Sequence, residues 1–200
     1  MAPREIGSLS LPPVSLSSQR LPIVTHSDAL TRVHRVRVNP KFFGKTGLNR
    51  FDSPHGEFGI LYTATDLHGA FIETFGDTRN RTVTVSALNE RAFARMELSR
   101  ALRLVDLTGA GLARIGADAR LFAGEHVRAQ QWSLAVWRHA SAVDGLYYRA
   151  RHDPSRFSVA VYNRASHVVT AVTQGSLMEA THRMTLARIL DDYQFSLLEA

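Results

Sequence analysis

The chain has 200 residues, of which 44% are hydrophobic and 21% are charged. This length suits one domain of ordinary size, and the composition excludes a wholly disordered, collagen-like or coiled-coil chain. No stretch of about 18 uncharged apolar residues occurs, so no membrane-spanning segment is predicted. Cysteine is absent, which excludes disulfides, thiolate-bound metals and a thiol nucleophile, and we expect a cytoplasmic protein.

The positive charge of the chain comes almost wholly from arginine. Lys and Arg together number 24 against 18 Asp and Glu, which gives a net charge of +6. A guanidinium binds phosphate and carboxylate groups through paired hydrogen bonds. The charge attracts polyanions in general, but without a run of five or more basic residues it does not indicate nucleic acid.

The N-terminal segment differs in composition from the rest of the chain. Residues 1–22 hold nine Ser or Pro residues and show no apolar periodicity. We interpret residues 1–24 as a Ser/Pro-rich arm that is flexible alone and could be ordered by a partner. A signal peptide is not expected, because no basic start leads into a continuous apolar run.

The first part of the globular region carries the clearest local signals. Residues 31–38 alternate and are β-branched, which predicts a strand, and Gly and Pro make 39–57 a long irregular loop. The apolar run 58–63 predicts a buried strand. Asp66 can then cap a helix that ends near Gly76.

The second part interleaves strands and helices without regular βαβ spacing. The patterns predict strands at 93–98, 102–107, 146–149, 157–162 and 168–172, and helices at 112–122, broken by Gly116, at 125–139, with Val127, Leu134 and Trp137 on one side, and at 177–198. This order favours an α+β fold. We therefore expect a central domain over 25–175 and a C-terminal helical extension over 176–200.

Most familiar catalytic motifs are missing. The sequence has no zinc-protease H-E-x-x-H, no P-loop and no G-x-S-x-G. The nine histidines are scattered without metal-ligand spacing, so no metal site is predicted. The Gly-Ala-Gly segment 109–111 has the wrong spacing for dinucleotide binding and predicts a plain turn.

Four polar residues between 31 and 75 remain as candidates. Glu73 has neighbours, Ala70, Phe71, Ile72, Thr74 and Phe75, that leave little solvated face, so its carboxylate is either paired with an arginine or held for function. Arg50 follows a Gly-rich loop and could bind a ligand or be a solvated surface residue. Tyr62 could be a core tyrosine or part of a site. Arg32 alternates with apolar positions and could point into a cleft or lie on an exposed edge.

The segment from Asn39 to Gly76 resembles the RES-domain family, which is named for its Arg, Glu and Ser. The matching residues run from the R-V-H of the first strand through Asn49-Arg50-Phe51, Leu61-Tyr62 and Ile72-Glu73-Thr74. The resemblance resumes in LVDLTG at 104–109, in the tryptophan helix 130–137 and in DGLYYRARHD at 144–153, and covers about residues 29–172.

The resemblance implies a fold, a reaction and a partner. Family members are toxins of bacterial toxin–antitoxin pairs with an ADP-ribosyltransferase-like fold, and they consume NAD+ by hydrolysis, by phosphorolysis or by ADP-ribosyl transfer. The partner implied is a small Xre-like antitoxin. No cofactor is implied besides NAD+ as substrate. By position, the resemblance assigns catalysis to Glu73, Tyr62 and Arg50, and substrate binding to Arg32, Arg50 and Tyr62.

One departure from the family pattern concerns its serine. The family serine falls in Y-R-S-R, where this chain has Tyr148-Arg149-Ala150-Arg151. Ser155 or Ser158 could substitute. Two alternatives therefore stay open, namely a catalytically weak or silent interaction module and a nucleic-acid-binding protein, the second favoured only by charge. A homo-oligomer is also compatible with the sequence.

Overall fold

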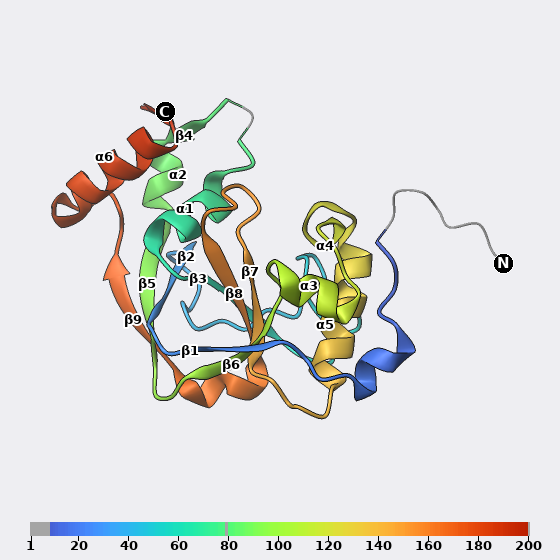
Figure 1. Ribbon diagram of the computed structural model, residues 1–200. Coiled ribbons are helices and arrows are strands. Elements are labelled where there is room, and N and C mark those ends of the chain that lie inside the picture. The colour runs from blue at the N-terminus through green and yellow to red at the C-terminus, as the bar shows by residue number, and fades with distance from the viewer. Residues whose placement is uncertain (1–8, 79, 200) are drawn as a thin grey trace.

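The computed structural model describes residues 9–78 and 80–199, in which eight strands form one mixed sheet (Figure 1). Its order is β1-β6-β7-β8-β3-β2-β5-β9, and every neighbouring pair is antiparallel except β6 and β7. The strands span Ile23–His26 (β1), Leu30–Arg35 (β2), Ile60–Ala64 (β3), Arg91–Leu98 (β5), Leu102–Asp106 (β6), Gly145–Arg149 (β7), Phe157–Tyr162 (β8) and Val169–Gly175 (β9). The predicted α+β class is confirmed.

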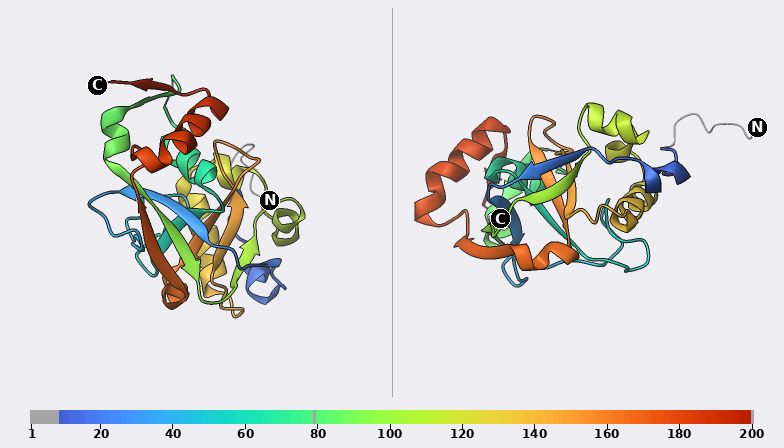
Figure 2. Two further views of the ribbon diagram at one scale, coloured as in Figure 1. Left: turned by 90° about the vertical axis from the view of Figure 1, so that its left-hand side faces the viewer. Right: turned by 60° about the horizontal axis from the view of Figure 1, so that its bottom comes forward.

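The helices form two groups on either side of the sheet centre, as Figures 1 and 2 show. One group contains α3 (Ala110–Ile115), α4 (Arg120–Ala123) and α5 (His126–Arg138), together with the short η1 turn (Val14–Ser18). The other contains α1 (Leu67–Phe75), α2 (Val85–Asn89) and α6 (Arg183–Asp192), with the small parallel pair β4 (Thr82–Thr84) and β10 (Ser196–Leu198). Two further turns, η2 (Asn163–Val168) and η3 (Ala180–His182), flank β9.

Three apolar clusters hold these layers together. In β8, Ala160 and Tyr162 face the cluster under α5, whereas Val159 and Val161 face a second cluster enclosed by the sheet and η2. This division follows from the alternation of side chains along a strand. The third cluster packs α1, α2 and α6 together around residues such as Phe71.

Several predicted elements are confirmed. Asp66 caps α1 by accepting a hydrogen bond from the Gly69 amide at 2.7 Å. Gly116, with φ of 78°, ends α3 and separates it from α4. The predicted first strand is shorter than expected, because Val38 N–H turns back to donate to the Arg35 carbonyl.

The prediction of a flexible N-terminal arm is wrong for the part that the structure describes; residues 1–8 lie outside it. Leu9, Leu16 and Leu21 are buried against the α5 cluster. The Trp132 indole also donates to the Ser10 carbonyl at 2.8 Å. Three spaced leucines therefore dock a segment whose Ser and Pro content alone indicated an arm.

The predictions for two helices also need correction. The predicted helix 177–198 is regular only over α6, because Gln194 adopts a φ of 54° and the chain then pairs with β4 as strand β10. On α5, Val127 is 62% exposed, while Gln130 and Ser133 are buried instead. Among the described residues, no helix is long and apolar enough to cross a membrane.

We expect Leu16→Ala to lower the free energy of unfolding by about 2–5 kcal/mol, because it removes a buried side chain and leaves a cavity under α5. Leu16 is 2% exposed, whereas its neighbour Val14 is 94% exposed. Val14→Ala is therefore the matched control, with an expected change within about 0.5 kcal/mol. Urea unfolding measures both, and equal stabilities would contradict the docking of this segment.

Candidate active site

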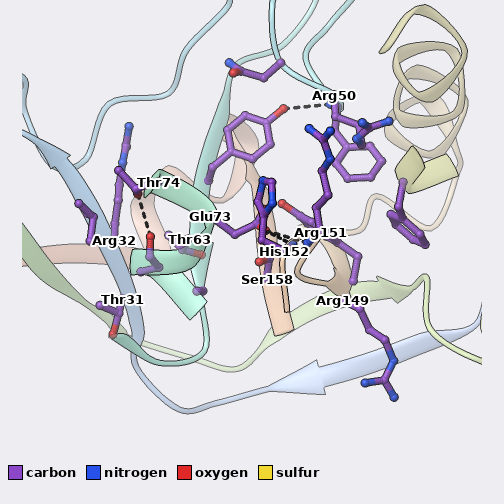
Figure 3. Close-up of a pocket in the computed structure, with 18 of the residues that line it drawn as sticks. Thr31, Arg32, Arg50, Thr63, Glu73, Thr74, Arg149, Arg151, His152 and Ser158 are labelled. Atoms are coloured by element: carbon purple, nitrogen blue, oxygen red, sulfur yellow. Dashed lines mark hydrogen bonds between the residues drawn. The ribbon is translucent and has the colours of Figure 1, made fainter. Parts of the chain in front are cut away.

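A cavity of about 380 Å³ lies between the two helical groups (Figure 3). Its floor contains one row of side chains that crosses the sheet through paired positions, Thr31, Ala64, Ser158 and Tyr148. The walls come from α1, the loop 36–59, the α4–α5 region and the turn between β7 and β8. Residues far apart in the chain therefore share one enclosure.

Three of the candidates from the sequence line this cavity from three different elements. Arg50 comes from the loop 36–59, Tyr62 from β3 and Glu73 from α1. Their side chains meet at one cavity because the fold brings these three elements together. Their catalytic and binding roles remain predictions.

Glu73 differs from its expected environment. The side chain is exposed, and its partners are backbone amides rather than an arginine side chain. Its Oε1 accepts hydrogen bonds from Arg151 N–H at 2.7 Å and His152 N–H at 3.3 Å. The apolar neighbours Phe71 and Ile72 bury into the third cluster, so the remaining face of α1, which carries Glu73, turns toward the cavity.

The Tyr62 hydroxyl is fully engaged within the protein. It accepts a hydrogen bond from Phe51 N–H at 3.0 Å and donates to Asp52 Oδ1 at 2.9 Å. Burial raises the pKa of Tyr62 well above its ordinary value, and the negative charge of Asp52 raises it further. Tyr62 is therefore a neutral, fixed group, suited to presenting its ring rather than to transferring a proton.

Arg50 is tied to the end of α4 but keeps its charge at the cavity. Its Nη1 donates to the carbonyls of Leu121 at 3.2 Å and Gly124 at 2.9 Å. Burial lowers the pKa of Arg50, the charge of Arg151 lowers it further, and Glu73 opposes the shift. Figure 3 shows Arg50 and Arg151 on the same side of the cavity. Two neighbouring guanidinium groups are suited to binding an anion.

Arg32 is placed differently from the other candidates. It belongs to the cavity wall, but it alternates along β2 with Thr31 and Val33, and Figure 3 shows it apart from Arg50. Its Nη1 donates to the carbonyls of Pro40 and Phe42, each at 2.9 Å. Burial lowers the pKa of Arg32 to about 10. These contacts anchor the loop 36–59, and substrate binding by Arg32 stays a prediction.

The sequence analysis considered the turn between β7 and β8 only for the family serine, and it did not predict Arg151, His152 or His126 as site residues. Arg151 and His152 line the cavity, and both lie near Asp77, with Arg151 Nη1 at 3.7 Å and His152 Nε2 at 3.5 Å from its Oδ1. His126, at the start of α5, lines the opposite wall. The only available signal was their place in or beside the segments that carry the family resemblance.

The position of the family serine is occupied by a buried alanine. Ala150 is 2% exposed, and its amide donates to the Arg156 carbonyl. Of the two possible substitutes, Ser158 lies in the cavity floor, whereas the Ser155 hydroxyl donates to Asp153 outside it. Of these two serines, only Ser158 lines the cavity.

The site is a basic, aromatic-lined cavity with one oriented carboxylate. Phe122 and Tyr148 stack with ring centroids 6.1 Å apart, and both line the cavity. Within the described ranges, no group of three or more His, Asp or Glu side chains could hold a metal ion. The residues present suit a ligand that combines negative charge with flat rings.

We expect Tyr62→Phe to destabilise the fold by about 1–3 kcal/mol, because it leaves the buried Asp52 carboxylate and the Phe51 amide each without one partner. Tyr147→Phe is the matched control, since no hydrogen bond of its hydroxyl occurs within the described residues, and its expected change is within about 0.5 kcal/mol. Chemical denaturation compares the two variants. Equal stabilities would show that the hydroxyl of Tyr62 does not support the loop.

The family model described as "RES domain" matches residues 29–186. A protein of Sinorhizobium fredii (strain NBRC 101917 / NGR234) named "Probable toxin y4kH" is 30% identical over 118 residues, which cover 58% of this chain and 90% of that protein.

Among solved structures, a chain of the M. tuberculosis MbcT–MbcA toxin–antitoxin complex matches with a TM-score of 0.61. The match covers 82% of this chain and 92% of that chain at 15% identity, so it shows a shared fold. Because the family model covers most of its length, this chain belongs to the RES-domain family.

Proposed function

We propose that this chain is a toxin-type enzyme that consumes NAD+ by cleaving the bond between nicotinamide and ribose, and that a cognate antitoxin neutralises it. The toxin role is supported by family membership and by the relative named as a probable toxin. The observation that carries the chemistry is the Glu73 carboxylate, oriented by two amides in a cavity that also holds Arg50 and Arg151.

The arrangement of the cavity matches the parts of NAD+. The pyrophosphate carries two negative charges, which the guanidinium groups of Arg50 and Arg151 can bind through forked hydrogen bonds. The rings of Tyr62, Tyr148 and Phe122 offer flat surfaces to the nicotinamide. Glu73 lines the same cavity, and we assign its carboxylate to the ribose that joins these two parts of NAD+.

The first chemical step needs a carboxylate more than it needs an acid. When the C1′–N bond breaks, its electron pair returns to nicotinamide, which is cationic in NAD+ and leaves as a neutral molecule. The ribose then develops oxocarbenium character, which a nearby carboxylate stabilises. Glu73 Oε1 accepts both of the hydrogen bonds that the backbone amides donate. Glu73 Oε2 can therefore face the positive charge on the ribose or its 2′-hydroxyl.

The second step is the capture of C1′ by a nucleophile that gives up a proton. Water yields ADP-ribose, inorganic phosphate yields ADP-ribose 1″-phosphate, and a protein side chain yields an ADP-ribosylated target. All three reactions share the first step. The products formed by the purified protein from NAD+, with and without phosphate, distinguish them.

A silent interaction module is the second candidate, and one observation favours it: Ala150 replaces the family serine. Such a module would bind its partner without consuming NAD+. Binding of an Xre-like partner can be examined with the same purified protein. Binding of RNA or DNA would appear as a salt-dependent gel shift with no loss of NAD+.

We expect Glu73→Gln to lower nicotinamide release at least about a hundredfold while NAD+ binding persists, because the amide keeps the size of the side chain but loses the charge that stabilises the ribose. Nicotinamide release and calorimetric NAD+ binding measure the two effects. In cells, the wild type should stop growth and deplete NAD+ unless the antitoxin is co-expressed, and the variant should do neither. Wild-type turnover by Glu73→Gln would remove Glu73 from the mechanism.

We expect Arg151→Gln to raise KM for NAD+ about tenfold or more, because a hydrogen-bonded charge on the pyrophosphate is lost. Arg149→Gln is the matched control from the same hairpin. Its guanidinium donates to the Pro154 carbonyl and lies over the Phe157 ring, and Figure 3 shows it pointing away from Arg50 and Arg151. Steady-state kinetics compare the variants, and equal KM values would contradict the proposed pyrophosphate site.

A further inference from the structure

The amides that donate to Glu73 belong to an irregular turn. The position of this turn therefore depends on contacts with other parts of the protein. Residues 150–156 connect β7 to β8 and are exposed in part. Within the turn, Ala150 N–H donates to the Arg156 carbonyl and Arg156 N–H to the Asp153 carbonyl, each at 3.0 Å. These two bonds close the ends of the turn but do not fix it against α1.

Asp153 connects the turn to the C-terminal segment. Its Oδ1 accepts hydrogen bonds from Ser155, while its Oδ2 accepts one from the Tyr193 hydroxyl at 2.8 Å. Arg156 Nε lies 3.5 Å from the same Oδ2. Burial raises the pKa of Asp153, but the hydrogen bonds from Ser155 and Tyr193 outweigh burial and the net shift is downward. The Asp153 carboxylate thus links the turn to Tyr193 in the C-terminal segment, which we call the tail.

Tyr193 follows α6 directly and lies beyond residue 186, where the match to the family model ends. Its position is fixed on a second side, because the neighbouring Asp192 accepts a hydrogen bond from His68 of α1 at 3.0 Å. The rings of His68 and Tyr193 are also in contact, with centroids 6.1 Å apart. The C-terminal segment therefore touches both the helix that carries Glu73 and the turn that orients it.

A second side-chain contact joins the turn directly to α1. Arg156, at the end of the turn, donates to Asp66 Oδ2 at 3.0 Å, and Asp66 is the N-cap of α1. The turn and α1 are thus joined at the helix start by Arg156, at Glu73 by the two amides, and through the tail by Tyr193 and Asp153. Of these links, only the tail link comes from outside the matched family region.

We propose that Tyr193 is a positioning residue for Glu73: its hydroxyl, through Asp153, holds the turn whose amides at 151 and 152 orient the Glu73 carboxylate. The catalytic part of this inference rests on the proposed function, whereas its structural part does not. A carboxylate that stabilises a ribose cation has to be held closely, and a misplacement of about 1 Å can cost about a hundredfold in rate. Loss of one distant hydrogen bond should cost less.

The test is Tyr193→Phe, which removes the hydroxyl and keeps the ring. We expect kcat for nicotinamide release to fall about tenfold with little change in KM, since Tyr193 does not line the cavity. Amide hydrogen exchange should become faster at residues 151 and 152 and stay unchanged in β2 and β5. Ser196→Ala is the matched control, because it removes an exposed hydroxyl from the same terminal segment.

Asp153→Asn provides a second variant in case Tyr193→Phe folds poorly. It retains an oxygen that can accept one hydrogen bond but loses the charge, so the kcat effects of the two substitutions should be less than additive when they are combined. Such coupling would not arise from two independent losses of stability.

The outcomes separate this inference from the proposed function. If the wild type releases no nicotinamide, the proposed function fails, and the exchange measurement alone decides whether Tyr193 holds the turn. The inference is overturned by wild-type exchange at 151 and 152 in Tyr193→Phe, by a KM effect at constant kcat, or by faster exchange throughout the protein with a lowered melting temperature. Faster exchange confined to the turn, with a lower kcat where activity exists, supports it.

Discussion

The contact between Glu73 and the amides of Arg151 and His152 is the interaction on which the site depends. It joins α1, from one side of the cavity, to the turn between β7 and β8. A carboxylate that accepts backbone hydrogen bonds is held without an opposing side-chain charge. Its negative charge therefore remains directed at the cavity, where an arginine partner would have neutralised it.

The second determinant of the site is the unequal distribution of charge around that carboxylate. Burial lowers the pKa of Arg50, the nearby charge of Arg151 lowers it further, and Glu73 opposes the shift. Asp77 lies 3.7 Å from Arg151, but it is strongly exposed, so solvent screens this ion pair. An anionic ligand between the two guanidinium groups would reduce their mutual repulsion. This reduction would favour binding of the ligand.

The long loop 36–59 is kept in place by buried polar contacts rather than by regular structure. Arg32 donates to two of its carbonyls, and the fully buried Asp52 accepts hydrogen bonds from Tyr62, Thr46 and Asn49. A buried carboxylate with several donors is costly to disturb. Arg50 and Phe51 reach the cavity because this network gives the loop one conformation.

Local periodicity and single residues with fixed conformational preferences were sufficient to predict the α+β class, most of the strands, the capped helix α1 and the broken helix at Gly116. The resemblance to the RES-domain family also pointed to Arg50, Tyr62 and Glu73, which all line the cavity. Amino-acid composition led to a wrong prediction for the Ser- and Pro-rich N-terminal segment. Three leucines dock this segment although its average composition is that of a flexible arm.

The atomic contacts of the site could not be predicted without the packed molecule. The partners of Glu73 are backbone amides, which a pattern of side chains cannot predict. They lie 78 and 79 positions away in the chain. The tail ends as a strand and not as a helix because β4 offers it a partner. Long-range pairing and burial are properties of the packed molecule, and they override local preference wherever the two compete.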